Sequence, residues 1–405
     1  MFDVNNIRKD FPMIVNNPNL IYFDNSATTY KPYCVLNAVK DFYENKTANV
    51  HRGDYDNSFI VSSEFDEARN VVAKFLNCDK NEVVFTSGAT HSLNQAAQYG
   101  FQYLEKGDVI LTTLSEHASN ILPWFNVSKK TGATIEYIKQ DKEGIIDLES
   151  FKKQMNSKVK VVTLAHVSNV LGHINPIKEI AKIVRKFDCI LVVDGAQSAP
   201  HIKVDVKDLD VDMFAFSSHK MCGPDGIGVL YGKSEILNKL EPLIYGGGSN
   251  ARFTSDGNIL LREIPERFEA GTPNIEGVLG LKKAVEYLMD IGMDNIHNHE
   301  VKLKDYMISK LKELDNVTLY NPSADTGIIA FNVKGVFSQD SGSYLNNKKI
   351  CVRSGHHCAK MVPNLINEND TVRASMYLYN TFEEIDRFIE ALSNLNIESA
   401  LDIFF

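Results

Sequence analysis

The chain has 405 residues, of which 44% are hydrophobic and 23% are charged, so it can build a sizeable globular core. Its length suggests two or three domains, or one large domain with a smaller companion. Lys and Arg total 43 against 52 Asp and Glu, and the resulting net charge of −9 argues against a surface for nucleic acid or anionic membranes.

The sequence shows no targeting or membrane signal. No apolar run is long enough to span a bilayer. The first ten residues lack the apolar core of a signal peptide, and Asp3 and Asp10 are unlike a transit peptide. We therefore expect a cytoplasmic protein. The six cysteines are scattered without a C-x-x-C pair, so we expect small buried side chains and one or more reactive thiols rather than a disulfide framework.

Strand-like and helix-like segments alternate over the first 280 residues. The β-branched runs predict strands, and apolar residues at helical spacing predict helices. The predicted helices are 64–76, 91–104 and 176–187, and the predicted strands are 83–85, 108–112, 159–164, 190–193 and 211–216. Such alternation predicts a mostly parallel sheet that is covered by helices on both faces.

After residue 280 the pattern changes. Residues 281–314 form a long helical stretch that is broken near Gly292, and further strands and a helix follow. The predicted strands are 317–320 and 328–333, and the predicted final helix is 383–395. We therefore expect a large domain over residues 21–280, and a small α+β domain made of residues 1–20 and 281–405.

Two of the predicted strands lead directly into charged side chains. The strand 190–193 ends at Asp194, and the strand 211–216 leads into SSHK, which ends at Lys220. In open α/β sheets, ligands bind beyond the carboxyl ends of the strands. Taken singly, a helix-capping aspartate and a solvated loop lysine remain the commoner alternatives.

Together these residues suit pyridoxal 5′-phosphate (PLP). This cofactor needs an amine for a Schiff base, an acid beside its pyridinium nitrogen and donors for its phosphate. Lys220 supplies the amine and Asp194 the acid. Ser217 and His219 are candidates for the phosphate, as is the small-residue turn 87–90 if it opens a helix.

A second reactive segment lies near the C-terminus. Residues 353–359 read RSGHHCA, so Cys358 has an arginine and two histidines beside it. Positive neighbours favour the thiolate form of cysteine, and Gly355 suggests a mobile loop. The alternatives are a zinc cluster that includes Cys351 and a buried structural cysteine.

Arg353 and Arg373 are candidates for binding an amino-acid carboxylate, because the planar guanidinium pairs bidentately with carboxylates. For each of them a surface ion pair is the alternative.

These segments, in this order, resemble the group II (Suf-type) cysteine desulfurases of the class V aminotransferase family. The similarity spans nearly the whole chain, and the short RxGHHC form is typical of group II. The matching segments are 22–29 (YFDNSATT), 51–53 (HRG), 116–117 (EH), Asn120, 123–124 (PW), 166–172 (HVSNVLG), 194–197 (DGAQ), 217–220 (SSHK), 246–249 (GGGS), 267–274 (RFEAGTPN), 353–358 (RSGHHC) and 373–375 (RAS).

The resemblance implies the α/β architecture of PLP fold type I, with a seven-stranded mostly parallel sheet between helices and a smaller α+β domain, in an obligate homodimer. It implies that Lys220 carries the Schiff base, that Cys358 carries a persulfide and that His117 stacks on the pyridine ring. The further cofactor residues that it implies are Asp194, Gln197, Ala89, Thr90, Ser217, His219 and, from the second subunit, Thr272. The substrate residues that it implies are Asn169, Arg353 and Arg373, and no metal is implied.

The implied reaction removes sulfur from L-cysteine, gives L-alanine and leaves a persulfide on Cys358. A sulfur-acceptor protein of the Suf system would then collect the sulfur for iron–sulfur cluster assembly. A selenocysteine lyase or cysteine sulfinate desulfinase, and a catalytically silent scaffold of cluster assembly, are the alternatives that the same residues leave open.

The sequence departs from the family pattern at three places. Ala118-Ser119 replaces a common His-Ala, Asp225 stands where threonine is frequent, and Lys360 stands where an uncharged residue is common. Asp225 adds negative charge near the cofactor lysine, and Lys360 adds positive charge beside Cys358. None of the departures removes a catalytic group.

Overall fold

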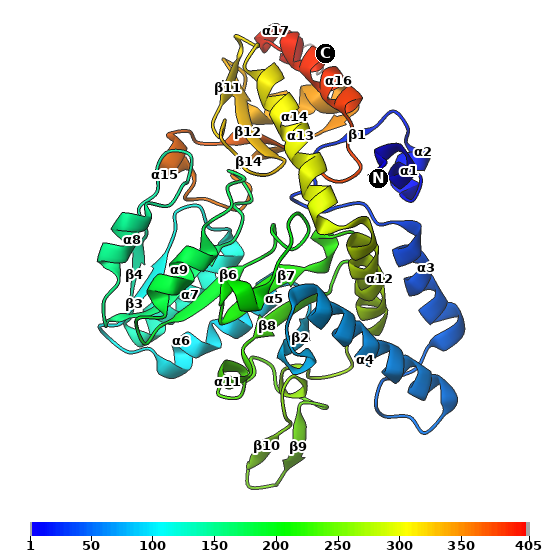
Figure 1. Cartoon of the computed structure of the whole chain (residues 1–405), viewed down its shortest axis with the longest axis vertical. Coiled ribbons are helices and arrows are strands. Elements are labelled where there is room, and N and C mark those ends of the chain that lie inside the picture. Colours follow the sequence, from blue (N-terminus) through cyan, green and yellow to red (C-terminus); the bar gives the residue numbers. More distant parts are fainter. Residues whose placement is uncertain (1, 402–405) are drawn as a thin grey trace.

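The computed structural model describes residues 2–401. Figure 1 shows a large α/β body and, at the end where the C-terminus lies, a smaller region with its own sheet. Within the described part of the chain, no helix is both long enough and apolar enough to cross a bilayer.

The large body is built on a seven-stranded sheet with the order β2-β8-β7-β6-β5-β3-β4. Its strands are β2 (Val83–Thr86), β8 (Gly228–Gly232), β7 (Met213–Ser217), β6 (Ile190–Asp194), β5 (Val159–Ala165), β3 (Val109–Thr112) and β4 (Thr134–Tyr137). Only β8 runs against the others, since both of its pairings are antiparallel. The predicted seven-stranded, mostly parallel sheet is therefore confirmed.

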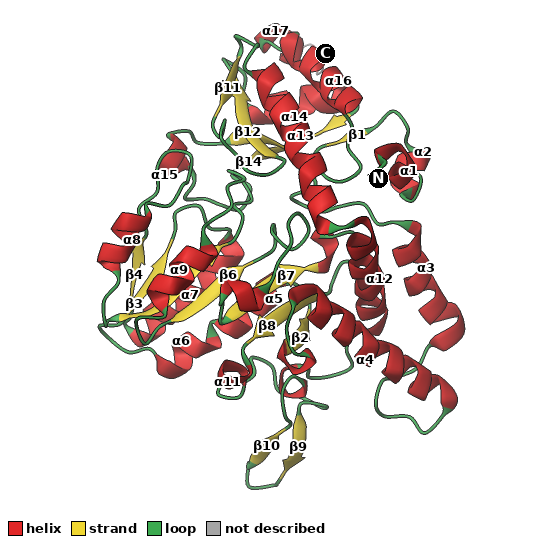
Figure 2. Cartoon of the chain, viewed as in Figure 1, coloured by secondary structure: helices red, strands yellow, loops and turns green. Residues whose placement is uncertain are grey.

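Helices cover both faces of this sheet (Figure 2). Alternate side chains of a strand point to opposite faces, so in β6 Leu191 and Val193 pack into one core while Ile190 and Val192 pack into another. The first core is covered by α3 (Tyr33–Asp41), α4 (Asp56–Leu76), α8 (Leu148–Gln154), α9 (Ile177–Val184), α10 (Val206–Leu209) and α12 (Ile275–Ile291). The second is covered by α5 (Ala89–Ala96), α6 (Gln98–Tyr103), α7 (Ala118–Thr131) and α11 (Ser234–Leu237).

Some predicted elements differ from the observed ones. Helix α4 begins at Asp56 rather than at residue 64, because its first turns expose Phe59 and Ile60 and so hide the apolar stripe. The predicted helix 91–104 is two helices, α5 and α6, that meet at Ala97. Strand β8 was not predicted, since Gly228 and Gly232 at its ends are unfavourable strand residues.

The smaller region contains an antiparallel sheet with the order β11-β12-β15-β14. Its strands are β11 (Val317–Leu319), β12 (Ile328–Val333), β15 (Thr371–Ser375) and β14 (Arg353–Gly355). The helices that share its core are α13 (Met293–Leu311), α14 (Ser338–Asn347), α16 (Phe382–Ser393) and α17 (Ile397–Leu401). Strand β1 (Ile21–Tyr22) also joins this region, because it pairs with β13 (Ile350–Cys351).

The two regions are linked by the helix pair α12 and α13, which is broken at Gly292 as the sequence predicts. Gly292 has a φ of 90°, a conformation that glycine adopts without the clash that a Cβ would cause. Helix α12 packs against α3 and α4 of the large body, whereas α13 packs in the smaller core. The predicted boundary at residue 281 lies inside α12. The domain division at residues 21 and 281 stays a prediction.

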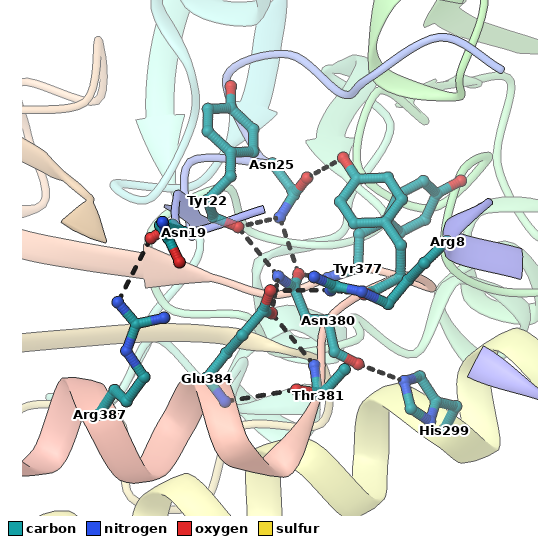
Figure 3. A network of polar contacts seen from close by, with 11 residues as sticks. Arg8, Asn19, Tyr22, Asn25, His299, Tyr377, Asn380, Thr381, Glu384 and Arg387 are labelled. Atoms are coloured by element: carbon teal, nitrogen blue, oxygen red, sulfur yellow. Dashed lines mark hydrogen bonds and ion pairs between the residues drawn. The ribbon is translucent and has the colours of Figure 1, made fainter. Parts of the chain in front are cut away.

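A closed polar network joins the N-terminal segment to the smaller region (Figure 3). Arg8 donates to Glu384 Oε1 and to the carbonyl oxygen of Tyr379, each at 2.7 Å. Asn380 donates to Glu384 Oε2 at 2.8 Å and accepts from Asn25 at 3.2 Å. We call Arg8, Asn25, Tyr379, Asn380 and Glu384 the junction network.

The remaining elements are a hairpin and several short helices. A hairpin of β9 (Asn250–Phe253) and β10 (Ile259–Leu261) projects from the large body and exposes Phe253 and Leu260 (Figure 1). The others are α1 (Val4–Arg8), α2 (Pro12–Asn16), η1 (Phe42–Lys46), η2 (Lys80–Glu82), η3 (Ser218–Lys220), η4 (Glu266–Phe268) and α15 (Pro363–Ile366).

Candidate active site

A cavity of about 220 Å³ lies where the carboxyl ends of the central strands meet the smaller region. Ala165, Asp194 and Ser217, the last residues of β5, β6 and β7, line it. The position agrees with the rule that ligands bind beyond the carboxyl ends of strands in open α/β sheets.

The cavity brings together twelve of the thirteen residues that the sequence singles out. They are Ala89, Thr90, His117, Asn169, Asp194, Gln197, Ser217, His219, Lys220, Arg353, Cys358 and Arg373. Thr272 lies elsewhere and is exposed, between two residues, Gly271 and Pro273, that line a separate cavity of about 260 Å³. Thr272 is predicted to bind the cofactor of a second subunit. The position of Thr272 within a single chain does not test this role, which stays a prediction.

Lys220 and Asp194 form the charged floor of the cavity. Burial lowers the pKa of Lys220 to about 8, although nearby Asp194 partly opposes that shift. Burial also raises the pKa of Asp194, against the Ala196 N–H at 2.9 Å and the positive charge of Lys220. A solvated loop lysine is therefore excluded. Asp194 accepts one backbone N–H as a cap would, but no helix begins there.

His117 stands at the start of α7 as its N-cap. Its Nδ1 accepts the backbone N–H of Ser119 at 3.1 Å, which leaves the ring proton on Nε2. Burial, followed by the positive charges of Lys220, Arg373 and Arg353, lowers the pKa of His117 to about 4. Near neutral pH this histidine is thus an uncharged ring with one defined tautomer.

Hydroxyl groups gather at the end of the cavity where α5 begins. The backbone N–H of Ala89, the first residue of α5, donates to Ser217 Oγ at 2.7 Å. Thr90 Oγ1 lies 2.7 Å from Ser119 Oγ on α7. Burial lowers the pKa of His219 to about 4, so this imidazole is neutral near pH 7. Such a set of hydroxyls at a helix N-terminus can bind an anion.

The loop that carries Cys358 is held by its backbone. The carbonyl oxygen of Cys358 accepts the N–H of Ala118 at 2.7 Å, and that of His357 accepts the Asn169 side chain at 2.9 Å. His357 and Cys358 both have left-handed backbones, with φ of 52° and 58°. The Cys358 side chain is left exposed, so the alternative of a buried structural cysteine is wrong.

His357 does not contribute the positive charge that the sequence suggested. It is buried, and its Nε2 lies 2.8 Å from Thr371 Oγ1. Burial, reinforced by Arg373 and Arg353, lowers the pKa of His357 to about 3. His357 is therefore a structural support of the loop and not a source of positive charge for Cys358.

Arg373 is only 2% exposed, which excludes the alternative of a surface ion pair. Its Nη1 donates to the carbonyl oxygen of Asn169 at 2.8 Å, and its Nη2 pairs with Asp24 at 3.0 Å. Burial lowers the pKa of its guanidinium. Arg353 is half-buried and lies directly opposite Arg373 in the β14–β15 pair. The two guanidinium-bearing residues thus reach the cavity from neighbouring strands.

Several buried polar atoms of the cavity have no partner among residues 2–401. They are Ser26 Oγ, Gln197 Oε1, His357 Nδ1 and Arg373 Nε. Buried polar atoms normally pair, so these atoms indicate a polar ligand. A half-buried amine, a buried carboxylate, a neutral imidazole and a hydroxyl-rich helix start fit the Schiff base, ring nitrogen, ring face and phosphate of PLP.

Sequence reasoning from the individual residues missed Ser26, which lines the cavity and receives no role above. Its carbonyl oxygen accepts the Gln197 side chain at 2.7 Å. Ser26 lies within the YFDNSATT segment, so that motif was the available signal. Ser119 was noted only as a departure from the family pattern, yet it too lines the cavity.

The sheet, the site at its carboxyl edge and the polar set within that site define the class of PLP enzymes of fold type I. Comparison with known proteins narrows this class. The model of the class V aminotransferases matches residues 21–388, and the chain belongs to this family.

Two curated relatives cover nearly the whole chain. A probable cysteine desulfurase of Halalkalibacterium halodurans is 44% identical over 95% of this chain and 96% of its own length. A probable cysteine desulfurase of Synechocystis is 42% identical over 95% and 94% of the two chains.

Solved structures are similar over the same extent. The apo cysteine desulfurase of Thermococcus onnurineus has a TM-score of 0.92 at 41% identity, covering 96% of this chain and 97% of its own. A cysteine desulfurase of Escherichia coli in an S-sulfonic acid form has a TM-score of 0.91 at 32% identity, covering 100% and 99%.

Proposed function

We propose that this chain is a PLP-dependent cysteine desulfurase that uses Cys358 as its sulfur carrier. The observation that carries the proposal is the exposed Cys358 thiol, which lines the same cavity as Lys220 and Asp194. An aminotransferase-type site needs no thiol for its own chemistry, whereas a sulfur-accepting site does. The names of the relatives at 44% and 42% identity agree with this function.

The overall reaction balances without a further redox partner. L-Cysteine and the Cys358 thiol give L-alanine and a Cys358 persulfide. The C–S bond of the substrate breaks, an S–S bond forms at Cys358 Sγ, and the thiol proton ends on the alanine product. The carbon that gains the proton is reduced by two electrons, and the two sulfurs of the persulfide are each oxidised by one.

Lys220 and Asp194 prepare the site for this chemistry. When bound at Lys220, PLP supplies an electron sink for the α-carbon of an amino acid. A pKa of about 8 leaves part of the Lys220 amine uncharged near neutral pH, so its Nζ can attack an aldehyde and can hold a proton taken from the substrate α-carbon. Asp194 presents a buried carboxylate at the end of β6 for a protonated ring nitrogen.

The substrate is oriented by the arginines and His117. Arg373 Nε–H has no partner among residues 2–401 and Arg353 faces the same cavity, so both can receive the substrate carboxylate. Neutral His117 offers a flat ring face and an Nε2–H, and either can act on a planar cofactor or its substrate. Cys358 then attacks the substrate sulfur as the nucleophile.

The fate of the sulfur belongs to the same proposal. We infer that a sulfur-acceptor protein of the Suf system takes it from exposed Cys358 and that iron–sulfur cluster assembly receives it. A homodimer, in which Thr272 completes the site of the second subunit, is part of this inference. The exposure of Thr272 and of the Cys358 thiol supports it.

The test measures alanine released from L-cysteine, and persulfide on the protein, for the wild type and for Cys358→Ala. The variant should bind PLP as a yellow Schiff base yet form no persulfide and release little alanine. Cys351→Ala is the matched control, because Cys351 is a half-buried thiol in β13 and does not line the cavity. Undiminished sulfur release by Cys358→Ala would exclude the proposed carrier.

The alternatives are outcomes of the same assay. A protein that stays colourless after incubation with PLP would support the catalytically silent scaffold. Turnover of selenocysteine or cysteine sulfinate that does not depend on Cys358, together with no turnover of cysteine, would support the related lyases.

A further inference from the structure

Two helices begin at the hydroxyl-rich end of the cavity. Helix α5 brings Thr90, its second residue, and α7 brings Ser119, also its second residue. Both side chains line the cavity, and their hydroxyl oxygens are 2.7 Å apart, a normal hydrogen-bond distance. The pair is thus a contact across two elements that are 29 residues apart in sequence.

The number of protons on the two hydroxyls determines which of them can donate to a third group. Two hydroxyl groups carry two protons, of which one is used in the bond between them. The second proton remains to be donated elsewhere. If Ser119 donates to Thr90, the Thr90 proton is directed away from Ser119, which leaves it available for an anion at the start of α5. An anion therefore favours this one arrangement, because each hydrogen bond in such a chain polarises the next.

The backbone of α7 explains why the Ser119 hydroxyl matters. The N–H of Ala118 is bound by the carbonyl oxygen of Cys358, and the N–H of Ser119 is bound by His117 Nδ1. The first two N–H groups of α7 are therefore occupied by other parts of the site. The hydroxyl of Ser119 is the group through which the start of α7 can act on an anion in the cavity.

We propose that Ser119 belongs to the phosphate site and acts as a positioning residue, by donating a hydrogen bond to Thr90 Oγ1 so that Thr90 donates to the phosphate of PLP. The inference rests on the proposed function, because it needs PLP in this cavity. The Ser119 hydroxyl touches Thr90 rather than the reacting atoms.

The test is the dissociation constant of PLP from Ser119→Ala, measured by equilibrium dialysis of the apoprotein. Loss of the neutral hydrogen bond that orients Thr90 should weaken PLP binding about three- to tenfold. Ser119→Thr keeps the hydroxyl and should restore the wild-type value. Ser309→Ala removes an exposed helix hydroxyl that bonds only to the Tyr306 carbonyl, and it should leave the constant unchanged.

Pyridoxal, which lacks the phosphate, separates the proposed role from a general disturbance of the site. Its affinity should be the same for the wild type and Ser119→Ala. The phosphorus NMR resonance of bound PLP should shift in Ser119→Ala, since Thr90, the donor to the phosphate, loses the hydrogen bond that orients it. An equal loss of affinity for PLP and pyridoxal would overturn the proposal.

A double-mutant cycle tests the relay through Thr90. In a Thr90→Ala background, Ser119→Ala should have no further effect on PLP binding, and a full additional loss would overturn the relay. Failure of this inference is distinguishable from failure of the proposed function. In the first case the wild type binds PLP at Lys220 and Ser119→Ala is unchanged, whereas in the second the wild type binds no PLP.

Discussion

The cavity and the junction network are both buried and polar, but they differ in how many of their polar atoms are hydrogen-bonded within the chain. In the junction network, the side-chain donors and acceptors of Asn380 and Glu384 are paired within the chain. In the cavity, Gln197 Oε1 and Arg373 Nε have no partner among the described residues. A closed network stabilises a fold, whereas open buried groups cost stability and are kept where a ligand completes them.

Lys220→Ala should give the largest effect and should act on the cavity alone. Removal of the amine that holds PLP and moves the α-proton should lower alanine formation from cysteine about 10³-fold or more. The free energy of unfolding of the apoprotein should stay the same or rise, since a partly buried amine is removed. A variant with more than a tenth of wild-type turnover would contradict the assignment of Lys220.

Arg373→Lys should separate the two roles of the arginine. The lysine keeps the charge near Asp24 but loses the planar fork. We expect the KM for cysteine to rise about 10- to 100-fold, from the loss of charge-assisted hydrogen bonds to the substrate carboxylate. Steady-state kinetics with L-cysteine measure this change in KM. Equal KM values in the variant and the wild type would remove Arg373 from the carboxylate site.

Glu384→Ala should have the opposite signature to Lys220→Ala. Its removal leaves the Arg8 guanidinium, 19% exposed, without its carboxylate and opens the Asn380 hydrogen bonds. The free energy of unfolding in urea should fall by about 3 kcal/mol. The KM of the folded fraction should not change. Glu384→Gln, which keeps a hydrogen-bond acceptor, should lose less. A change in KM without a loss of stability would contradict a purely structural junction.

The pH dependence of PLP uptake should report the pKa of Lys220. Only the uncharged amine attacks the aldehyde, so the rate of Schiff-base formation by the apoprotein should rise with pH and level off above about 8. Below that value it should fall about tenfold per pH unit. Asp194 favours the charged amine, so Asp194→Asn should move the midpoint to lower pH. A midpoint near the ordinary lysine value would contradict the buried position of Lys220.

The sequence predicted those parts of the fold that carry local signals. Strand β12 coincides with the predicted 328–333, because its β-branched and aromatic residues leave no other reading, and the helix break at Gly292 follows from glycine chemistry. Strand β4 was missed because Thr134–Tyr137 is a mostly exposed edge strand without a continuous apolar run. Its place in the sheet depends on pairing with β3, which no local pattern encodes.

The same division holds in the site. Lys220 and Asp194 could be predicted because each follows a strand, and strand ends share one edge of a parallel sheet. The contact between Thr90 and Ser119 could not be predicted, since it depends on how α5 and α7 pack. The neutrality of His357 was likewise hidden, because its burial against Thr371 comes from the smaller sheet and not from its charged sequence neighbours.

The role of Cys358 as sulfur carrier is tested most directly by the location of sulfur after a single turnover with sulfur-labelled L-cysteine. Mass spectrometry of peptides from the alkylated protein would locate the added sulfur atom among the six cysteines. We predict the label on Cys358, with one equivalent of alanine released, and no label when Lys220→Ala is used. Label on another cysteine, or alanine release without labelled Cys358, would contradict it.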